Sequence, residues 1–149
     1  ALYEGLKKAH WPGRLELLQR EPVVIVDGAH NPQGVEALME AMSLLFPEKK
    51  LNIVIGVLAD KDYASSIEIA KPHAKKFYTV SPPSYRALSS EQLADEIHHH
   101  SSVPVDAFDS TPAALRSALA ESKNDDVICI FGSLYQVGEI RTYFGRSSF

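Results

Sequence analysis

The sequence predicts an α/β fold with a mostly parallel sheet of six strands, helices on both faces and one antiparallel edge strand. Short apolar runs alternate with segments of helical periodicity, which is typical of parallel strands joined by crossover helices. Two of the runs, 23–26 and 51–57, are almost continuously apolar, as expected of strands that helices cover on both faces. The length of 149 residues suits one domain with one core, so we expect residues 1–149 to form a single unit.

The chain begins with a lead-in, residues 1–10, which we expect to be helical and to connect this domain to another. Two strands are predicted next, at 14–18 and 22–26, with a turn near Gln19–Glu21 between them. The first of the two is expected to be the antiparallel edge of the sheet.

A helix is predicted from Asn31 to Phe46, because its apolar residues recur three and four positions apart. Pro32 suits the first turn, where its missing N–H does no harm, and Pro47 ends the pattern. Strands and helices then alternate in the order of a Rossmann-like, doubly wound sheet. Further strands are predicted at 51–57, 77–80, 103–106 and 127–131, and further helices at 62–71, 90–99, 111–121 and 134–144.

The composition limits the possible partners and locations. The net charge is −4, the pI is near 5.8, and no basic segment interleaves with aromatic residues, so we expect no nucleic-acid partner. No charged-then-apolar leader and no apolar stretch of about 18 residues occurs, so we expect no signal peptide and no membrane span. The one cysteine, Cys129, lies in an apolar run and is expected to be a core thiol. A chain without an internal disulfide suits a reducing, cytoplasmic location.

Most of the functional information lies in six residues, Asp-Gly-Ala-His-Asn-Pro at 27–32, which follow a buried strand and open a helix. Ligands of open α/β sheets gather at the carboxyl ends of strands. The carboxylate of Asp27 suits hydroxyl groups such as those of a ribose, and His30 and Asn31 lie at a helix N-terminus, which favours an anion. The same residues could instead simply cap the helix, and the pattern alone leaves both interpretations open.

Three other segments carry polar groups at strand ends. Arg14 follows a tight turn and offers a planar guanidinium that suits phosphate, although a lone surface arginine is more often simply solvated. The segment 56–62 places Asp60 and Asp62 before a helix, where capping is the favoured role. Ser133 follows the last strand and offers a hydroxyl group.

The sequence carries no motif for a metal ion or for a phosphate cradle. His98, His99 and His100 diverge by about 100° each on a helix, so they cannot all face one ion and are expected to form a solvated helix end. The six histidines and one cysteine lack the spacing of a zinc site. None of the eight glycines precedes a lysine, so there is no P-loop, and a bound nucleotide would need its phosphate cradle from elsewhere.

Four blocks of the sequence together closely resemble the carboxyl-terminal domain of the folylpolyglutamate synthase/dihydrofolate synthase family, in the Mur ligase superfamily. The blocks occur in the family's order and span about residues 11–141. They are Pro-Gly-Arg-Leu-Glu at 12–16, Asp-Gly-Ala-His-Asn-Pro at 27–32, Gly-Val-Leu-Ala-Asp-Lys-Asp at 56–62 and Gly-Ser-Leu-Tyr-Gln-Val-Gly at 132–138.

This resemblance implies ATP-dependent amide bond formation, in which a folate or pteroate carboxylate is phosphorylated and the amine of L-glutamate attacks the acyl phosphate. It also implies that the P-loop, the magnesium ligands and most of the folate site belong to an amino-terminal domain absent from this chain. The chain itself would hold no metal and would form one wall of the ATP and glutamate cleft. We therefore expect it to be inactive alone.

The same resemblance assigns roles to single positions. Arg14 matches an arginine that reaches the ATP phosphates, and Asp27 matches an aspartate near the ribose. His30 matches a residue that handles glutamate or the acyl phosphate, and Ser133 matches a serine at the glutamate site. Arg14 and His30 would then be catalytic, with Arg14 stabilising charge on the transferring phosphate. Lys61 falls within a family motif and could meet the anionic substrate.

Two alternatives remain open at the level of sequence. One is a receiver-like or small-ligand-binding domain on a similar sheet. A receiver needs an acidic pair after its first strand and a lysine after its last, whereas this chain has Asp27 alone and Ser133. The other is a Mur-superfamily ligase that joins an amino acid to a cell-wall precursor, although the block at 132–135 favours the folate branch.

Overall fold

The computed structural model describes residues 14–146, so the predicted helical lead-in lies outside the described residues. The elements alternate between strand and helix after the first two strands. The strands are β1 (Glu16–Arg20), β2 (Val23–Val26), β3 (Leu51–Ile55), β4 (Ala74–Thr79), β5 (Val105–Ala107) and β6 (Val127–Phe131). The helices are α2 (Pro32–Leu45), α3 (Tyr63–Ala70), the short 3-10 helix η1 (Lys71–His73), α4 (Ser90–His100), α5 (Thr111–Glu121) and α6 (Leu134–Tyr143).

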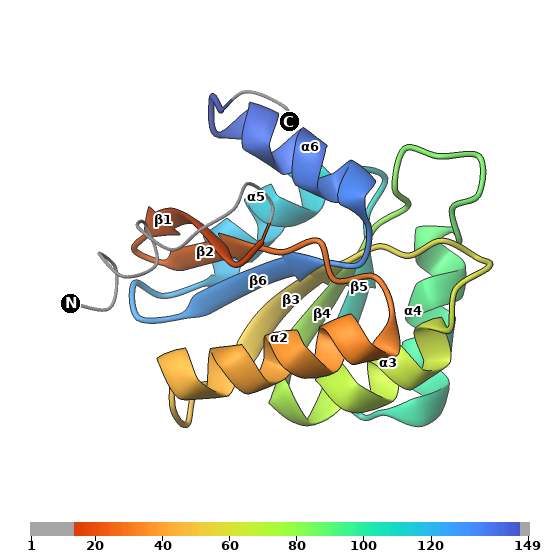
Figure 1. Ribbon diagram of the computed structural model, residues 1–149, viewed down its shortest axis with the longest axis horizontal. Coiled ribbons are helices and arrows are strands. Elements are labelled where there is room, and N and C mark those ends of the chain that lie inside the picture. The colour runs from red at the N-terminus through yellow and green to blue at the C-terminus, as the bar shows by residue number, and fades with distance from the viewer. Residues whose placement is uncertain (1–13, 147–149) are drawn as a thin grey trace.

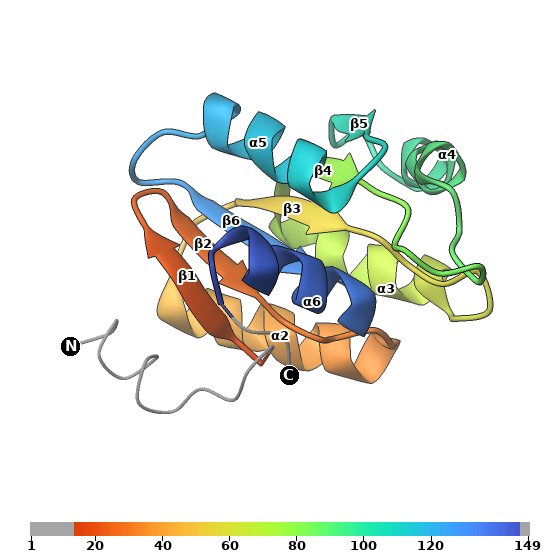
Figure 2. The ribbon, with the colours of Figure 1, turned by 90° about the horizontal axis from the view of Figure 1, so that it is seen from above.

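The six strands form one sheet in the order β1-β2-β6-β3-β4-β5. β1 pairs with β2 antiparallel at one edge, and all other neighbouring strands are parallel. Helices α2 and α3 cover one face of the sheet and α5 and α6 cover the other (Figure 1). The view from above shows α6 lying over the part of the sheet that contains β2 and β6 (Figure 2). The predicted fold class is therefore confirmed.

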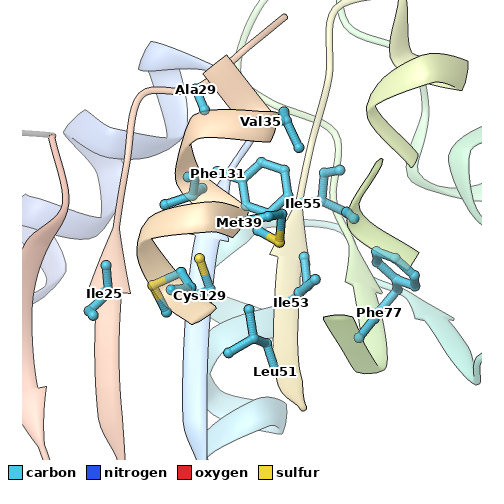
Figure 3. Close-up of a cluster of buried hydrophobic side chains, with 14 of the residues drawn as sticks. Ile25, Ala29, Val35, Met39, Leu51, Ile53, Ile55, Phe77, Cys129 and Phe131 are labelled. Carbon is cyan, nitrogen blue, oxygen red and sulfur yellow. The ribbon is translucent and has the colours of Figure 1, made fainter. Parts of the chain in front are cut away.

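Both faces of the sheet carry an apolar core, as the continuous apolar runs predicted. On the α2 side, Met39 packs among side chains of β6 and β3, including Cys129, Phe131 and Ile53 (Figure 3). Cys129 is fully buried, so it is the core thiol that the sequence predicted. The second core lies between the sheet and helices α5 and α6. Its strand residues, such as Ile130, point to the opposite face of the sheet from those of the first core.

Several element boundaries differ from those predicted. The first strand is 16–20 rather than 14–18, because Leu15 has a φ of 47°, which an extended strand does not allow. The turn accordingly lies at Glu21–Pro22, which is a cis peptide, rather than at 19–21.

The third strand ends at Ile55 rather than at residue 57, because the chain then pairs across a loop. The carbonyl of Val57 accepts the N–H of Leu88, and Leu58 forms an antiparallel bridge with Ala87. This pairing ties the loop after β3 to the loop after β4.

The fourth and fifth strands also differ from the prediction. The fourth begins at Ala74 rather than at 77, since its lysines carry their charges outward to Asp126, Asp106 and Glu121. The fifth is 105–107 rather than 103–106, since Pro104 has no N–H to donate to the sheet.

The loops after β6 and β3 are in direct contact. Gly132 has a φ of +123°, and a Cβ atom built on it would lie 1.9 Å from the carbonyl oxygen of Gly56. Only glycine fits there, both for its backbone conformation and for the available space. The carboxyl ends of neighbouring strands are thereby held together at one edge of the sheet.

Candidate functional site

The predicted polar segments meet at the carboxyl edge of the sheet, around the ends of β2 and β6. The pairing of these strands continues beyond their ends, because the N–H of Asp27 donates to Ile130 at 2.9 Å and the N–H of Gly132 donates to Ala29 at 2.9 Å. The segment 27–32 and Ser133, which are about a hundred residues apart in the sequence, therefore lie next to each other.

Asp27 organises the backbone around it. One carboxylate oxygen accepts the N–H of Leu15 and the other accepts the N–H of Ala29, both at 2.8 Å. The side chain is half-buried and does not cap α2. It instead fixes the segment that carries Arg14 against the end of β2.

The capping interpretation is correct for Asn31 and Asp62, and Ser133 also caps a helix, a role that was not predicted. Asn31 caps α2 by accepting the N–H of Gly34 at 2.8 Å, and Asp62 caps α3 by accepting the N–H of Ser65 at 3.2 Å. Ser133 caps α6, with its hydroxyl oxygen 3.4 Å from the N–H of Gln136. Asp60, for which capping was also predicted, does not cap α3 and instead pairs with Arg86.

A hollow of about 740 Å³ opens at this edge, between the start of β1 and α2. Its polar lining includes Arg14, Asp27 and His30, and its apolar lining comes largely from α2, including Leu38 and Ala41. Such a volume lies within the range of small-molecule and cofactor sites. A positively charged guanidinium beside an apolar wall suits a nucleotide, which has both a charged and an aromatic end.

A second hollow, of about 400 Å³, lies on the other side of His30. It is lined by His30, Leu58, Lys61, Arg86, Ser133, Leu134 and Tyr135. The basic side chains of Lys61 and Arg86 and the N-terminus of α6 face the same space, which favours an anionic ligand. No carboxylate is part of this lining, although the lining residue Arg86 is paired with the carboxylate of Asp60.

Arg86 was not identified from the sequence. Its guanidinium lies 2.5 Å from a carboxylate oxygen of Asp60, and its carbonyl accepts the N–H of Ala59 at 2.8 Å. The hydrogen bond from Arg86 lowers the pKa of Asp60, and the same bond raises the pKa of Arg86. The one feature of the sequence that could have indicated Arg86 is its position in the irregular segment after the strand predicted at 77–80.

His30 contributes to both hollows and is exposed. Its Nδ1 lies 2.9 Å from the carbonyl oxygen of Gly28, and because a carbonyl can only accept, this nitrogen carries the proton. In the neutral ring the other nitrogen, Nε2, is therefore an acceptor. His30 can accept a hydrogen bond from an amine or a hydroxyl group at the junction of the hollows.

The three consecutive histidines take no part in this site. His98, His99 and His100 are exposed at the end of α4, and His99 bonds the carbonyl of Asp95 at 2.7 Å. Among residues 14–146, no three histidine, cysteine or acidic side chains are placed to hold a metal ion. The same part of the chain has no helix long and apolar enough to cross a membrane.

Known proteins resemble the chain along most of its length. A family model described as "Mur ligase, glutamate ligase domain" matches residues 13–134. The dihydrofolate synthase/folylpolyglutamate synthase of Bacillus subtilis is 35% identical over 142 residues, which are 95% of this chain and 32% of that protein.

Solved structures agree with this similarity. Escherichia coli FolC in complex with DHPP and ADP matches with a TM-score of 0.84 and 30% identity, over 95% of this chain and 33% of that one. A bifunctional folylpolyglutamate synthase/dihydrofolate synthase with Mn, AMPPNP and L-glutamate bound matches with a TM-score of 0.82 and 27% identity, over 95% of this chain and 34% of that one. The chain thus spans about one third of the length of each of these proteins.

Proposed function

The chain belongs to the Mur ligase family, whose glutamate ligase domain it matches, and from this premise we propose that it is the carboxyl-terminal domain of a folate ligase. The full-length protein would use ATP to add L-glutamate to folate or dihydropteroate. Family membership sets aside the receiver-like alternative. The relatives named as folylpolyglutamate and dihydrofolate synthases favour the folate branch over a cell-wall ligase.

In the proposed reaction, ATP transfers its terminal phosphoryl group to a carboxylate of the pterin substrate. The amine of glutamate then attacks the acyl phosphate, an amide bond forms, and inorganic phosphate leaves. The chain has to offer a nucleotide surface and an amino-acid surface next to each other. The two hollows that share His30 have this arrangement, and this observation carries the proposal.

The nucleotide would occupy the larger hollow. Arg14 would stabilise the charge that accumulates on the transferring phosphoryl group, a contribution of fixed positive charge rather than proton transfer. Asp27 would accept a hydrogen bond from a ribose hydroxyl in addition to the two backbone N–H groups that it already accepts. The apolar side of α2 would contact the uncharged part of the nucleotide.

Glutamate would occupy the smaller hollow. Its two carboxylates need cationic partners, and Lys61 and Arg86 supply them from separate loops. Ser133 and the N–H groups at the start of α6 would add hydrogen-bond donors. His30 lies between the hollows, where the attacking amine would meet the acyl phosphate.

The remaining parts of the machinery are assigned to the protein's own amino-terminal P-loop domain. That domain would cradle the ATP phosphates, hold magnesium and bind most of the folate. When bound, magnesium would neutralise charge on the phosphate oxygens. We place the complete enzyme in the cytoplasm, with no nucleic-acid or membrane partner.

The test is ADP formation by the full-length protein that contains this chain, with each substrate omitted in turn. We expect ADP only when ATP, magnesium, L-glutamate and either dihydropteroate or a folate are all present, with one ADP formed per glutamate added. ADP formation with a cell-wall precursor in place of the folate would assign the chain to the other branch of the family.

A further inference from the structure

A buried charge cluster close in the chain to Arg14 takes no part in the proposed reaction. Glu16 on β1 is 3% exposed, although it is a carboxylate on an edge strand. Arg141, on α6, binds both of its carboxylate oxygens through Nη1 and is itself buried. Arg146 lies 3.4 Å from Glu16 and also donates to the carbonyl of Leu17 at 3.1 Å.

One residue separates this cluster from Arg14, and that residue has an unusual backbone. Leu15 has a φ of 47°, in the left-handed region that a branched side chain rarely adopts. Residues held in this region persist only when their surroundings fix them from more than one side. Leu15 is held on one side by its N–H, which donates to Asp27 at 2.8 Å, and on the other side by buried Glu16.

Because of the turn at Leu15, the side chains before and after it point to opposite faces of the sheet. Glu16 reaches α6, and Leu18, two residues on, belongs to the core beneath α5 and α6. Arg14 instead lines the hollow that is bordered by α2, on the other face. The orientation of Arg14 therefore depends on the left-handed turn, and the turn depends on the two anchors.

We propose that Glu16 and Arg141 form a positioning pair that aims Arg14 into the nucleotide hollow. Neither residue lines the hollow, so each acts through Arg14. This inference rests on the proposed function, because it assumes that Arg14 meets the ATP phosphates.

Stability alone does not explain such a pair. The desolvation of two buried charges often exceeds their mutual attraction, and apolar residues of similar volume are frequently as stable or more stable. An ion pair, in contrast with an apolar contact, fixes direction, because an arginine meets a carboxylate in a defined geometry. Arg14, two residues before Glu16, needs such a fixed direction in order to point into the hollow.

The test replaces both partners at once in the full-length protein, Glu16→Leu with Arg141→Met, so that neither buried partner keeps its charge without the other. We expect a midpoint of unfolding close to that of the wild type. We also expect kcat/KM for ATP to fall about tenfold or more, because a small misplacement of a group that contacts the reacting phosphate lowers the rate strongly. The KM for L-glutamate should stay within about twofold of the wild-type value. The matched control is Lys76→Met with Glu121→Leu, an ion pair of 2.9 Å between β4 and α5, which should leave both parameters unchanged.

A positioning role also predicts non-additivity with Arg14→Ala. If the pair acts only through Arg14, adding Arg14→Ala to the double variant should give no greater loss than Arg14→Ala alone. Fully additive losses, or wild-type ATP kinetics in a folded double variant, would overturn the proposal. An Arg14→Ala variant with normal ATP kinetics would instead contradict the proposed function itself.

A more conservative variant keeps the proposal testable if the double variant does not fold. Arg141→Lys keeps the positive charge beside Glu16 but removes the planar guanidinium that fixes the direction of the contact. We expect a loss of about fivefold or more in kcat/KM for ATP, with an unchanged KM for glutamate. Wild-type ATP kinetics in Arg141→Lys would contradict a positioning role.

Discussion

At the scale of single residues, Arg14 carries the nucleotide part of the proposed function. Its side chain is exposed, so Arg14→Ala should change the free energy of unfolding by no more than about 0.5 kcal/mol. Loss of a fixed positive charge at a transferring phosphoryl group should lower kcat/KM for ATP about 100-fold or more. Steady-state ADP formation by the full-length protein measures this effect.

The matched control is Arg20→Ala, an exposed arginine six positions further along the chain, at the end of β1. It removes the same charge from the domain but lies outside both hollows. We expect it to leave the kinetics near those of the wild type. Equal losses in the two variants would mean that Arg14 acts through net charge rather than through contact.

Arg86 carries the corresponding prediction for glutamate. Arg86→Met keeps the length of the side chain and removes the guanidinium, so the KM for L-glutamate should rise about tenfold or more while the KM for ATP stays unchanged. Asp60→Asn is the informative partner variant, because it removes the carboxylate that competes for Arg86. We expect its KM for glutamate to be equal to or lower than that of the wild type, and a large rise would show that Asp60 itself supports binding.

The residues brought together at the site were only partly predictable from the sequence. Asp27, His30 and Ser133 could be found because polar residues at strand ends mark the carboxyl edge of an α/β sheet. Arg86 could not be connected to Asp60, since they lie 26 positions apart with α3 and β4 between them and no local pattern links two loops. The pairing of Glu16 with Arg141 spans 125 positions and leaves no periodic signal at all.

At the scale of elements, the contact between the loops after β6 and β3 is the most sensitive point of the edge. Gly132→Ala would place a methyl group 1.9 Å from the carbonyl oxygen of Gly56, in a backbone conformation that alanine rarely adopts. We expect the domain to lose at least about 3 kcal/mol of unfolding free energy. Urea denaturation of the 149-residue chain provides the measurement.

Gly138→Ala is the control from the same helix region. Nothing lies within 4 Å of a Cβ atom at Gly138, which is inside α6. Alanine is the better helix former, so this variant should gain up to about 1 kcal/mol. A Gly132→Ala variant as stable as the wild type would mean that the two loops do not meet as described.

The elements themselves were more predictable than their boundaries. Strands and helices follow from apolar periodicity, and the order of the elements restricts the sheet to a few topologies. The first strand was misplaced by two residues because the left-handed turn at Leu15 is stabilised by Asp27, a contact between segments. The third strand ended early because Val57 and Leu58 pair with the loop at 87–88, which no local propensity encodes.

At the scale of the whole molecule, we propose that the domain presents one wall of a site rather than a complete enzyme. Its described residues offer cations, hydrogen-bond donors and an apolar surface, and they include no three side chains placed to hold a metal ion. The chain spans about one third of the relatives that it resembles. We propose a division of labour in which another domain supplies the phosphate cradle and the metal.

The most direct test of this division compares the 149-residue chain with the full-length protein under identical conditions. Each is incubated with ATP, magnesium, L-glutamate and dihydropteroate, and ADP is measured over time. We expect glutamate-dependent ADP formation from the full-length protein and none above background from the 149-residue chain. Glutamate- and dihydropteroate-dependent ADP formation by the chain alone would contradict the assignment of the phosphate cradle and the metal to another domain.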